Sequence, residues 1–421
     1  MKQIIIVATM AMCGSLCAWA DAPTLSVENV IFRQRYPWNG LVDIDCTVNC
    51  SDSTTNISLY MSAKDTAANK SLAVRSVWLE NDTTHTNALE VKSGTHRLVW
   101  DAGRDNPNFV GDAVTVEVQA YTCLYLVIDL SGGPDAASYP VSYLSTEPQS
   151  GWTDEYKTTK LVMRRIQPGT FTMGSPSDEF GRFSDEDQHE VTISQPFYIG
   201  VFEVTQKQYE LVTGAVPSGY IGDARPVECV TWNMIRGNSS TYDWPDSSEV
   251  DPSTFIGKLR TKAGIEELDL PTEAQWEYAC RAGTTTAFNS GKNLTSHYQD
   301  SAMDEVGRYS YNNGYKGGCK DGRGGYSDYH TTVGSYLPNA WGLYDMHGNV
   351  WEWTLDGYQS NLGMSSVTDP AGPSSKSFRV LRGGSWRSTT NICRSSSRSR
   401  YRPRLGGDEY GFRLVGTLPN Q

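Results

Sequence analysis

The segment from Pro338 to Thr354, PNAWGLYDMHGNVWEWT, constrains the fold of this chain more than any other. Its seventeen positions hold three tryptophans, two glycines, two acids and two asparagines, without the spacing of a helix or a strand. The glycines allow backbone conformations that other residues avoid, and the tryptophans bring large apolar surfaces to bury. Asp345 and Glu352 add carboxylates, the oxygen ligands that hard cations prefer. The sequence therefore predicts a compact loop held by aromatic side chains, with two acids available to a metal ion.

The length and charge of the chain limit the number of domains and the kinds of partner that we expect. A chain of 421 residues exceeds the usual size of a single core, so two domains are expected. Its 39 glycines and 19 prolines indicate that these domains are rich in loops. The net charge of −12 argues against binding to nucleic acid and to anionic membrane surfaces, because both require clustered lysine and arginine.

Residues 1–20 have the pattern of a secretory signal peptide. Lys2 supplies a positive charge, Ile4–Met12 an apolar core, and Ala18–Ala20 a small-residue cleavage site. The apolar run is too short to cross a bilayer, and no other segment is long enough to predict a membrane span. We therefore expect the mature protein to be secreted or periplasmic, where disulfides can form.

Residues 21–130 are expected to form an all-β domain, a sandwich of the immunoglobulin-like kind. Short runs of strand-forming residues, such as 41–45, 57–60 and 114–118, are separated by clusters of turn-forming residues. Nothing in this region has a catalytic pattern.

Residues 131–160 are rich in serine, glycine, proline and threonine and are interpreted as a linker, with one added strand around Tyr139 to Leu144. Residues 161–421 then form a second, α+β domain with many loops. Two capping boxes, Thr205–Gln208 and Thr272–Gln275, predict short helices, and Gly283 ends the second. The rest of the chain has almost no regular period, and its many aromatic residues predict ordered loops.

The second domain resembles the sulfatase-modifying-factor family, whose founding activity is the generation of formylglycine. The matching motifs occur in the family's order and contain many rare residues. They are Pro168–Ser175, Gln188–Thr192, Phe202–Thr205, Leu270–Ala279, Pro338–Thr354, Leu381–Trp386 and Gly411–Arg413. The resemblance implies a C-type-lectin-like fold with little regular secondary structure and with bound calcium. The N-terminal domain lies outside it.

The resemblance also implies which residues hold one calcium ion. They are the side chains of Asp345 and Glu352 and the backbone oxygens of Gly348 and Val350. Such a set suits calcium, which takes six to eight hard oxygen ligands in relaxed geometry. A second calcium of the family would fall between Tyr309 and His330, where the sequence does not place its ligands. In the alternative interpretation, Asp345 caps a turn and Glu352 pairs with an arginine.

The resemblance places Ser385, Ser388 and Cys393 at catalytic positions. Formylglycine-generating enzymes bind copper(I) through two cysteines after the Gly-Gly-Ser motif, and here the first of these is Ser388. A serine hydroxyl is a poor ligand for copper(I), which prefers soft thiolates. The role of copper is therefore doubtful, although a lone catalytic Cys393 remains an alternative.

The cysteines lead to two disulfide predictions. Family enzymes often bridge the cysteine of the Glu-Tyr-Ala-Cys helix to one just past the catalytic pair, which implies a bridge between Cys280 and Cys393 here. In the N-terminal domain, Cys123 can pair with Cys46 or with Cys50, and the sequence leaves the choice open.

An arginine-rich stretch near the C-terminus has two interpretations. Its guanidinium groups either line a groove for an acidic ligand or pair internally with Asp345, Glu352, Asp408 and Glu409. The stretch consists of Arg387, Arg394, Arg398, Arg400, Arg402 and Arg404.

Two histidines are weak candidates for ligands. His189 follows the acids Asp185, Glu186 and Asp187, which are expected to be a solvated loop. His347 lies inside the aromatic segment and is expected to be a packed or an exposed turn residue.

Taken together, the sequence predicts an exported, calcium-stabilised binding or accessory protein that recognises a protein or peptide ligand with acidic groups. The alternative is an oxygen-dependent oxidase that converts a sulfatase cysteine to formylglycine.

Overall fold

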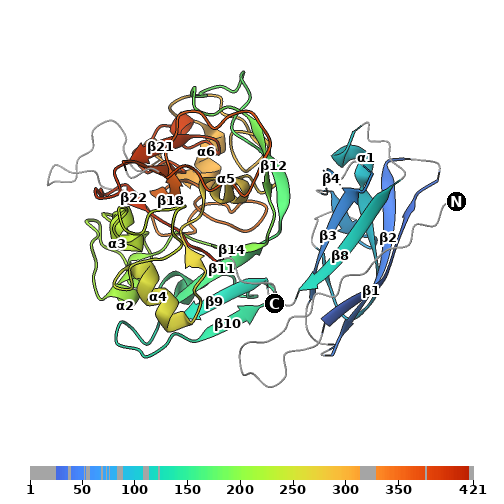
Figure 1. Ribbon diagram of the computed structural model, residues 1–421, viewed down its shortest axis with the longest axis horizontal. Coiled ribbons are helices and arrows are strands. Elements are labelled where there is room, and N and C mark those ends of the chain that lie inside the picture. The colour runs from blue at the N-terminus through green and yellow to red at the C-terminus, as the bar shows by residue number, and fades with distance from the viewer. Residues whose placement is uncertain are drawn as a thin grey trace. The chain divides into compact units, whose positions relative to one another are not determined.

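The computed structural model describes residues 25–416, apart from 37–38, 52, 54–56, 68–69, 73, 75, 83–88, 108–112, 122–123, 313–328 and 375–376. The described chain consists mostly of strands and loops, with few helices (Figure 1). It divides into two compact units. One consists of Met1–Leu124, Tyr143–Thr146 and Pro419–Gln421, and the other of Tyr125–Ser142 and Glu147–Leu418. The predicted signal peptide lies outside the described residues.

The first unit contains two antiparallel sheets, as expected for the N-terminal all-β domain. The first sheet has the order β1 (Leu25–Gln34), β2 (Leu41–Cys50), β7 (Gly94–Asp101), β5 (Val77–Leu79). In the second sheet, β3 (Ile57–Asp65) pairs with β4 (Lys70–Leu72), β6 (Glu90–Val91) and β8 (Val114–Tyr121). A short helix, α1 (Ala102–Asp105), follows β7.

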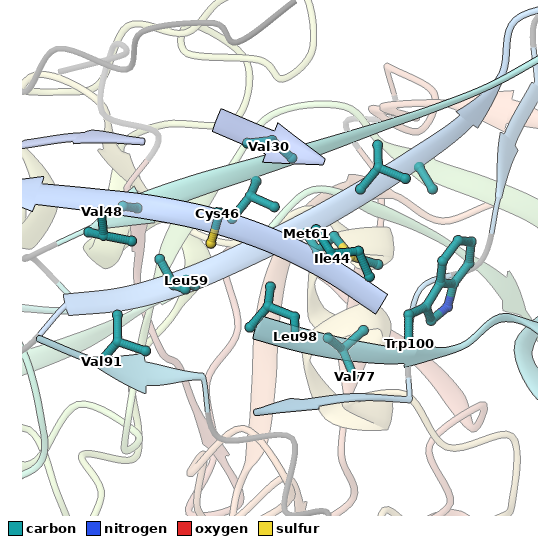
Figure 2. Close-up of a cluster of buried hydrophobic side chains, with 14 of the residues drawn as sticks. Val30, Ile44, Cys46, Val48, Leu59, Met61, Val77, Val91, Leu98 and Trp100 are labelled. Atoms are coloured by element: carbon teal, nitrogen blue, oxygen red, sulfur yellow. The ribbon is translucent and has the colours of Figure 1, made fainter. Parts of the chain in front are cut away.

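The two sheets share one apolar core, to which β2 and β3 contribute alternate residues. In β2 the buried positions include Ile44, Cys46 and Val48, which alternate with more exposed residues. Figure 2 shows them beside Met61 of β3 and Leu98 of β7 in the same apolar cluster. Cys46 is thus a core residue with a free thiol, whereas Cys123 lies outside the described residues.

The main sheet of the second unit begins earlier than the sequence predicted. Its order is β10 (Val141–Leu144), β9 (Tyr125–Asp129), β11 (Lys160–Ile166), β14 (Phe197–Gly200), β23 (Val415–Gly416), β15 (Leu268–Asp269). Residues 125–130 were assigned to the sandwich and 131–160 to a linker, but β9 pairs along β11 from Tyr125 to Asp129. The physical reason is burial: four of the five residues of β9 are buried, as in a central strand.

Three smaller sheets complete the second unit. One joins β12 (Gly169–Met173), β13 (His189–Ile193) and β19 (Val367–Thr368), and another joins β16 (Gly307–Arg308) to β17 (His347–Gly348). The third has the order β21 (Arg398–Tyr401), β20 (Arg379–Arg382), β18 (Trp351–Gly357), β22 (Tyr410–Gly411). The aromatic segment therefore ends in β18, at the middle of this sheet.

The helices are short, and two of them confirm the predicted capping boxes. They are η1 (Asp154–Lys157), α2 (Gln206–Thr213), α3 (Trp232–Arg236), α4 (Phe255–Ala263), α5 (Glu273–Arg281), α6 (Ser301–Val306) and η2 (Thr390–Ile392). Thr205 and Gln208 cap α2 reciprocally, and Thr272 and Gln275 do the same for α5. Among the described residues, the longest helices have nine residues, and none is apolar and long enough to cross a membrane.

A buried carboxylate joins α5 to β18. Asp356 accepts a hydrogen bond at 2.6 Å from the backbone N–H of Glu273, the first residue of α5. Burial, reinforced by the Glu273 carboxylate, raises the pKa of Asp356 to about 7. The folded protein therefore binds this proton more tightly than the unfolded chain does.

We expect Asp356 to make the stability of the protein fall between about pH 4 and pH 7. A raised folded-state pKa gives stability that is fully present below the unfolded pKa and is lost as the pH rises through the folded pKa. Asp356→Asn keeps an oxygen for the Glu273 N–H but carries no charge, so the variant should exceed the wild type by roughly 2–4 kcal/mol at pH 8. The difference should vanish near pH 4 in urea denaturation. Exposed Asp135→Asn is the control, and parallel pH profiles for Asp356→Asn and wild type would contradict the assignment.

Candidate functional site

The Gly-Gly-Ser turn follows directly from the end of β20. Gly383 and Gly384 have φ values of 91° and 80°, in the left-handed region that favours glycine. A Cβ on Gly384 would lie 2.6 Å from the Sγ of Cys393, so the turn and the cysteine pack tightly. The turn delivers Ser385 and Ser388 to the place where the resemblance predicted catalytic residues.

The Ser388 hydroxyl is part of a closed hydrogen-bonded turn. It accepts from the backbone N–H of Ser385 at 3.0 Å and lies 3.2 Å from the Ser385 hydroxyl. Ser385 in turn donates to Glu409 at 2.6 Å. Ser388 is 7% exposed. The residue at the first copper position therefore stabilises a turn, and its oxygen is a hard donor.

Cys393 occupies the second copper position, but its side chain is completely buried. It follows η2 and packs in an apolar cluster with Phe288, Met303 and Tyr309. Burial raises the pKa of the Cys393 thiol, which disfavours the thiolate that a copper(I) ion would require. The structure therefore places Ser388 and Cys393 near one turn without bringing together two exposed soft ligands.

Buried arginines fix the segment that follows Cys393. Arg394 makes two contacts with Glu186, at 2.6 and 2.8 Å, and neither side chain has exposed surface. Arg398 forms a forked pair with Glu273 at 2.6 and 2.9 Å. Forked contacts of this kind set both position and orientation. Three of the six arginines thus pair internally, because Arg387 also contacts Asp408 at 2.7 Å.

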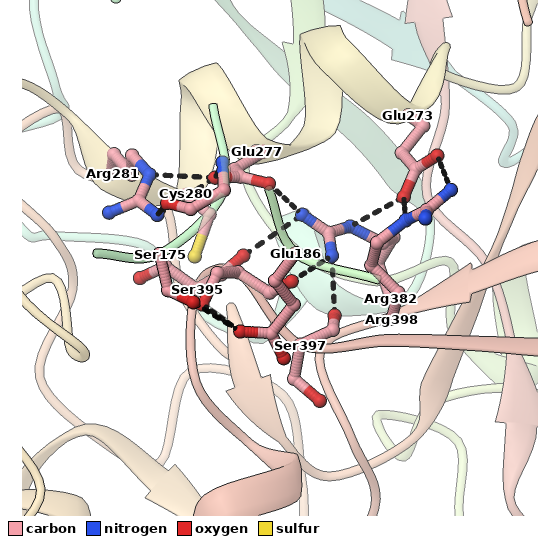
Figure 3. Close-up of polar contacts among 12 residues, drawn as sticks. Ser175, Glu186, Glu273, Glu277, Cys280, Arg281, Arg382, Ser395, Ser397 and Arg398 are labelled. Carbon is pink, nitrogen blue, oxygen red and sulfur yellow. Dashed lines mark hydrogen bonds and ion pairs between the residues drawn. The ribbon is translucent and has the colours of Figure 1, made fainter. Parts of the chain in front are cut away.

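Arg382 also holds this segment, as Figure 3 shows. Its guanidinium lies between Glu277 of α5 and the backbone carbonyl oxygens of Ser395 and Ser396, to which it donates at 3.0 and 2.9 Å. Breaking a buried pair of this kind costs about 3–5 kcal/mol. The segment around Cys393 is therefore held rigidly inside the domain.

The remaining arginines of the stretch face solvent. Arg400, Arg402 and Arg404 are exposed, and no ion pair to them is found among the described residues. Arg400 stacks on Tyr358 at 4.3 Å, and Arg387 stacks on Trp386 at 4.4 Å. The internal-pairing interpretation therefore holds for Arg387, Arg394 and Arg398 and not for these three residues.

The predicted disulfide between Cys280 and Cys393 is absent from the structure, in which both are free thiols. Cys280 belongs to a different apolar cluster, around Trp276 and Leu343, and burial raises its pKa to about 12. The imidazole of His347 contacts both residues: its Nε2 lies 3.9 Å from Cys280 Sγ, and its Nδ1 bonds to the Cys393 carbonyl oxygen at 2.7 Å.

His347 is packed inside the domain, one of the two expected states, and it lies in the short strand β17 rather than in a turn. The backbone N–H of Asn289 donates to Nε2 at 3.1 Å, so Nδ1 carries the proton that is donated to Cys393. Burial lowers the pKa of His347 to about 4. His347 is therefore neutral and fully engaged in the fold.

The acidic loop before His189 is less exposed than the sequence suggested. Glu186 is fully buried against Arg394, and Asp187 pairs with Arg182 at 2.5 Å. His189 is 6% exposed and bonds through Nδ1 to the Asp187 carbonyl oxygen at 3.1 Å. These side chains are used in structural contacts.

The predicted calcium loop has an unusual backbone. Asp345, Gly348 and Asn349 have φ values of 57°, 79° and 60°, a region that glycine, aspartate and asparagine tolerate best. Asp345 accepts from the backbone N–H of Gly334 at 2.6 Å through Oδ2, while its buried Oδ1 has no partner. Burial raises the pKa of Asp345 to about 6.

Glu352, the second predicted ligand, is paired with an arginine. Arg413 contacts both of its oxygens at 2.6 Å, and Trp276 donates its indole N–H to Oε2 at 2.8 Å. All three side chains are fully buried. Glu352 therefore has the arginine partner that the alternative interpretation predicted.

Glu203 is a residue of this site that the sequence analysis did not identify. It is fully buried and accepts from the amide of Asn349 at 2.5 Å and from the backbone N–H of Val350 at 3.1 Å. Burial, with the nearby carboxylates of Asp345 and Glu352, raises its pKa well above the usual range. The sequence feature that could have identified Glu203 is its place as a single acid in the otherwise apolar run from Phe197 to Val204.

The site has an excess of buried negative charge. Three carboxylates, Glu203, Asp345 and Glu352, lie near one another, and Arg413 is the guanidinium that faces them. In the part of the chain that is described, no group of three or more His, Cys, Asp or Glu side chains has a metal-binding arrangement. A cation here would depend on the unpartnered Asp345 oxygen and on backbone oxygens. The region predicted for a second calcium lies largely outside the described residues.

Comparison with known proteins gives the family. Residues 151–418 match the sulfatase-modifying factor enzyme 1-like domain. The chaperone protein LppX of Paenibacillus barcinonensis is 31% identical over 269 residues, which cover 59% of this chain and 87% of LppX. The formylglycine-generating enzyme of Mus musculus is 27% identical over 303 residues, covering 61% of this chain and 75% of the enzyme.

Among solved structures, PvdO from Pseudomonas aeruginosa aligns with 27% identity and a TM-score of 0.48, covering 61% of this chain and 94% of PvdO. The family match spans more than half of the chain and includes the aromatic loop, the Gly-Gly-Ser turn and α5. This protein is a member of the family that carries the sulfatase-modifying factor enzyme 1-like domain.

Proposed function

We propose that this protein is an exported binding or accessory member of its family and does not generate formylglycine. The observation that carries the proposal is Ser388, whose hydroxyl closes a turn at the position of a copper ligand. Export rests on the predicted signal peptide alone. The chaperone name of the relative LppX agrees with an accessory role, whereas the relationship to the mouse enzyme motivates the alternative.

The chemistry of copper(I) supports this choice. The ion is held by soft thiolates, and a neutral hydroxyl that is already hydrogen-bonded to Ser385 offers a hard oxygen instead. Cys393 would have to lose a proton inside an apolar cluster to act as the remaining ligand. The buried pairs of Arg394 and Arg398 oppose any opening of this segment.

The exposed arginines suggest what the protein binds. Arg400, Arg402 and Arg404 present guanidinium groups to solvent on a chain whose net charge is −12. Guanidinium groups bind carboxylates through paired hydrogen bonds. The stacked rings of Tyr220 and Tyr329 contact Trp386 edge-on, and Arg387 stacks on the same tryptophan. We propose a protein or peptide ligand with acidic side chains.

Calcium is part of the proposal as a structural ion. Asp345 and Glu352, with backbone oxygens of Gly348 and Val350, would hold it, and it would neutralise the excess carboxylate charge of the site. The unpartnered Oδ1 of Asp345 supports this assignment, because a buried anionic oxygen without a partner is costly.

The first prediction of the proposal concerns catalysis. With copper(I), oxygen and a peptide containing Cys-x-Pro-x-Arg, the purified mature protein should produce no aldehyde detectable by mass spectrometry. The mouse formylglycine-generating enzyme is the positive control. Turnover by the wild-type protein would overturn the proposal and establish the oxidase.

The second prediction concerns calcium. Removing it with a chelator should lower the melting temperature, because a ligand bound only by the folded state stabilises that state. At a calcium concentration 100 times the dissociation constant, the difference should be about 2.7 kcal/mol, or about 5–10 °C. Asp345→Asn should reduce this calcium-dependent shift. Equal melting curves with and without calcium would contradict a structural calcium.

A further inference from the structure

The strand β21 has one edge that no other described strand covers. It pairs with β20 alone, in a register that runs from Arg398 opposite Arg382 to Tyr401 opposite Arg379. Apart from this pairing, β21 makes no backbone–backbone hydrogen bond with another described segment. In an antiparallel pair, every second residue directs its N–H and C=O away from the partner strand. The outer edge of β21 therefore offers backbone donors and acceptors to an additional strand.

The two arginines of β21 lie on the same face of the strand, because alternate residues point to the same side. Both guanidinium groups lie over the ring of Tyr358, at 5.1 Å from its centroid for Arg398 and 4.3 Å for Arg400. Arg398 is buried and forms its forked pair with Glu273. Arg400 is exposed, and no carboxylate contacts it among the described residues. Arg400 is thus the arginine of this strand whose charge is left for a ligand.

Two aromatic rings fix the position of the Arg400 guanidinium. It lies 4.3 Å from the ring centroid of Tyr358 and 5.4 Å from that of Phe378. The ring of Tyr358 is itself held, because its hydroxyl donates to Asp185 at 2.8 Å. Stacking uses the flat face of a guanidinium and leaves the N–H groups at its rim free to donate. A carboxylate at this rim meets donors that are already oriented, which lowers the entropic cost of binding.

The spacing of charge along this edge fits an extended partner. Arg402, two residues after Arg400, is also exposed and has no ion pair within the described part of the chain. In an extended peptide, side chains on one face are roughly 7 Å apart, because every second residue lies on that face. Acidic side chains at alternate positions therefore match the spacing of these two arginines, while the peptide backbone pairs with β21.

We propose that β21 is a docking edge for an extended acidic peptide, which joins its four-stranded sheet as a further strand and places a carboxylate on Arg400. The inference rests on the acidic ligand proposed above and specifies how that ligand binds. In strand addition, backbone hydrogen bonds supply the affinity and side-chain contacts supply the specificity. In the opposite case, the arginines only keep other strands from this edge, as charged residues do on many edge strands.

The probe is a fluorescein-labelled peptide of alternating threonine and glutamate, whose binding to the full-length mature protein is followed by fluorescence anisotropy. Strand addition predicts saturable binding that weakens about 10-fold when glutamine replaces the glutamates. Two further peptides carry N-methyl groups, either on every threonine or on every glutamate. Because only alternate amides of an added strand point to the edge, one of these peptides should lose binding and the other should keep it.

Substitutions of Arg400 test the anchor in the protein. Arg400→Gln should weaken the glutamate peptide about 10-fold, and Arg400→Lys should restore only part of the affinity, because lysine lacks the flat fork. Arg104→Gln is the control, since it removes an exposed arginine of α1 in the first unit. It should bind within about 2-fold of wild type, because salt screens distant charges. Hydrogen exchange followed by mass spectrometry should show slower amide exchange in the segment that contains β21 when the peptide is bound.

The outcomes separate docking at β21 from the binding of acids in general. Glutamate-dependent binding that both N-methylated peptides share equally would overturn strand addition and leave an acidic ligand in place. Unchanged amide exchange in β21, or wild-type affinity in Arg400→Gln, would have the same meaning. No binding of the glutamate peptide, or equal binding of the glutamine peptide, would overturn both the docking edge and the acidic ligand.

Discussion

In the second unit, buried guanidinium groups donate hydrogen bonds to backbone carbonyl oxygens, most of which lie in loops outside the helices and strands. Arg382 donates to carbonyl oxygens of the segment Ser395–Ser397, Arg379 donates to those of Trp244 and Leu355, and Arg413 donates to those of Gly200 and Tyr344. A loop inside a core must satisfy such oxygens or lose stability. Each of these arginines also needs a buried acid, here Glu277, Asp243 and Glu352, so the loops and the ion pairs depend on each other.

This dependence explains how the Gly-Gly-Ser region holds its shape with a serine at position 388. Arg382, Arg394 and Arg398 hold the backbone after Cys393, and the tight contact of Gly384 with Cys393 holds the backbone before it. A serine at position 388 then fits the turn by hydrogen-bonding to Ser385. The scaffold does not require a thiol at that position, because its stability comes from charges and carbonyl groups elsewhere.

The sequence predicted features that depend on a few neighbouring residues. Both capping boxes were confirmed, because the Thr and Gln of each box contact each other across three residues. The boundary of the second unit was wrong, since only the pairing of β9 with β11 distinguishes Tyr125–Asp129 from a sandwich strand. The partners of Arg394 and Arg398 were also missed. Glu186 lies 208 residues from Arg394, and no local pattern encodes a contact over that separation.

The charge balance of the aromatic loop depends on one arginine. Glu352 is neutralised by Arg413, as the alternative had it, and that pairing removes one negative charge from a site with three. The other two acids, Glu203 and Asp345, have raised pKa values, because burial favours their neutral forms. Had Arg413 been absent, the same loop would carry three uncompensated carboxylates. Arg413 therefore neutralises one acid beside this loop, while Glu203 fixes the loop by accepting hydrogen bonds from the Asn349 amide and the Val350 N–H.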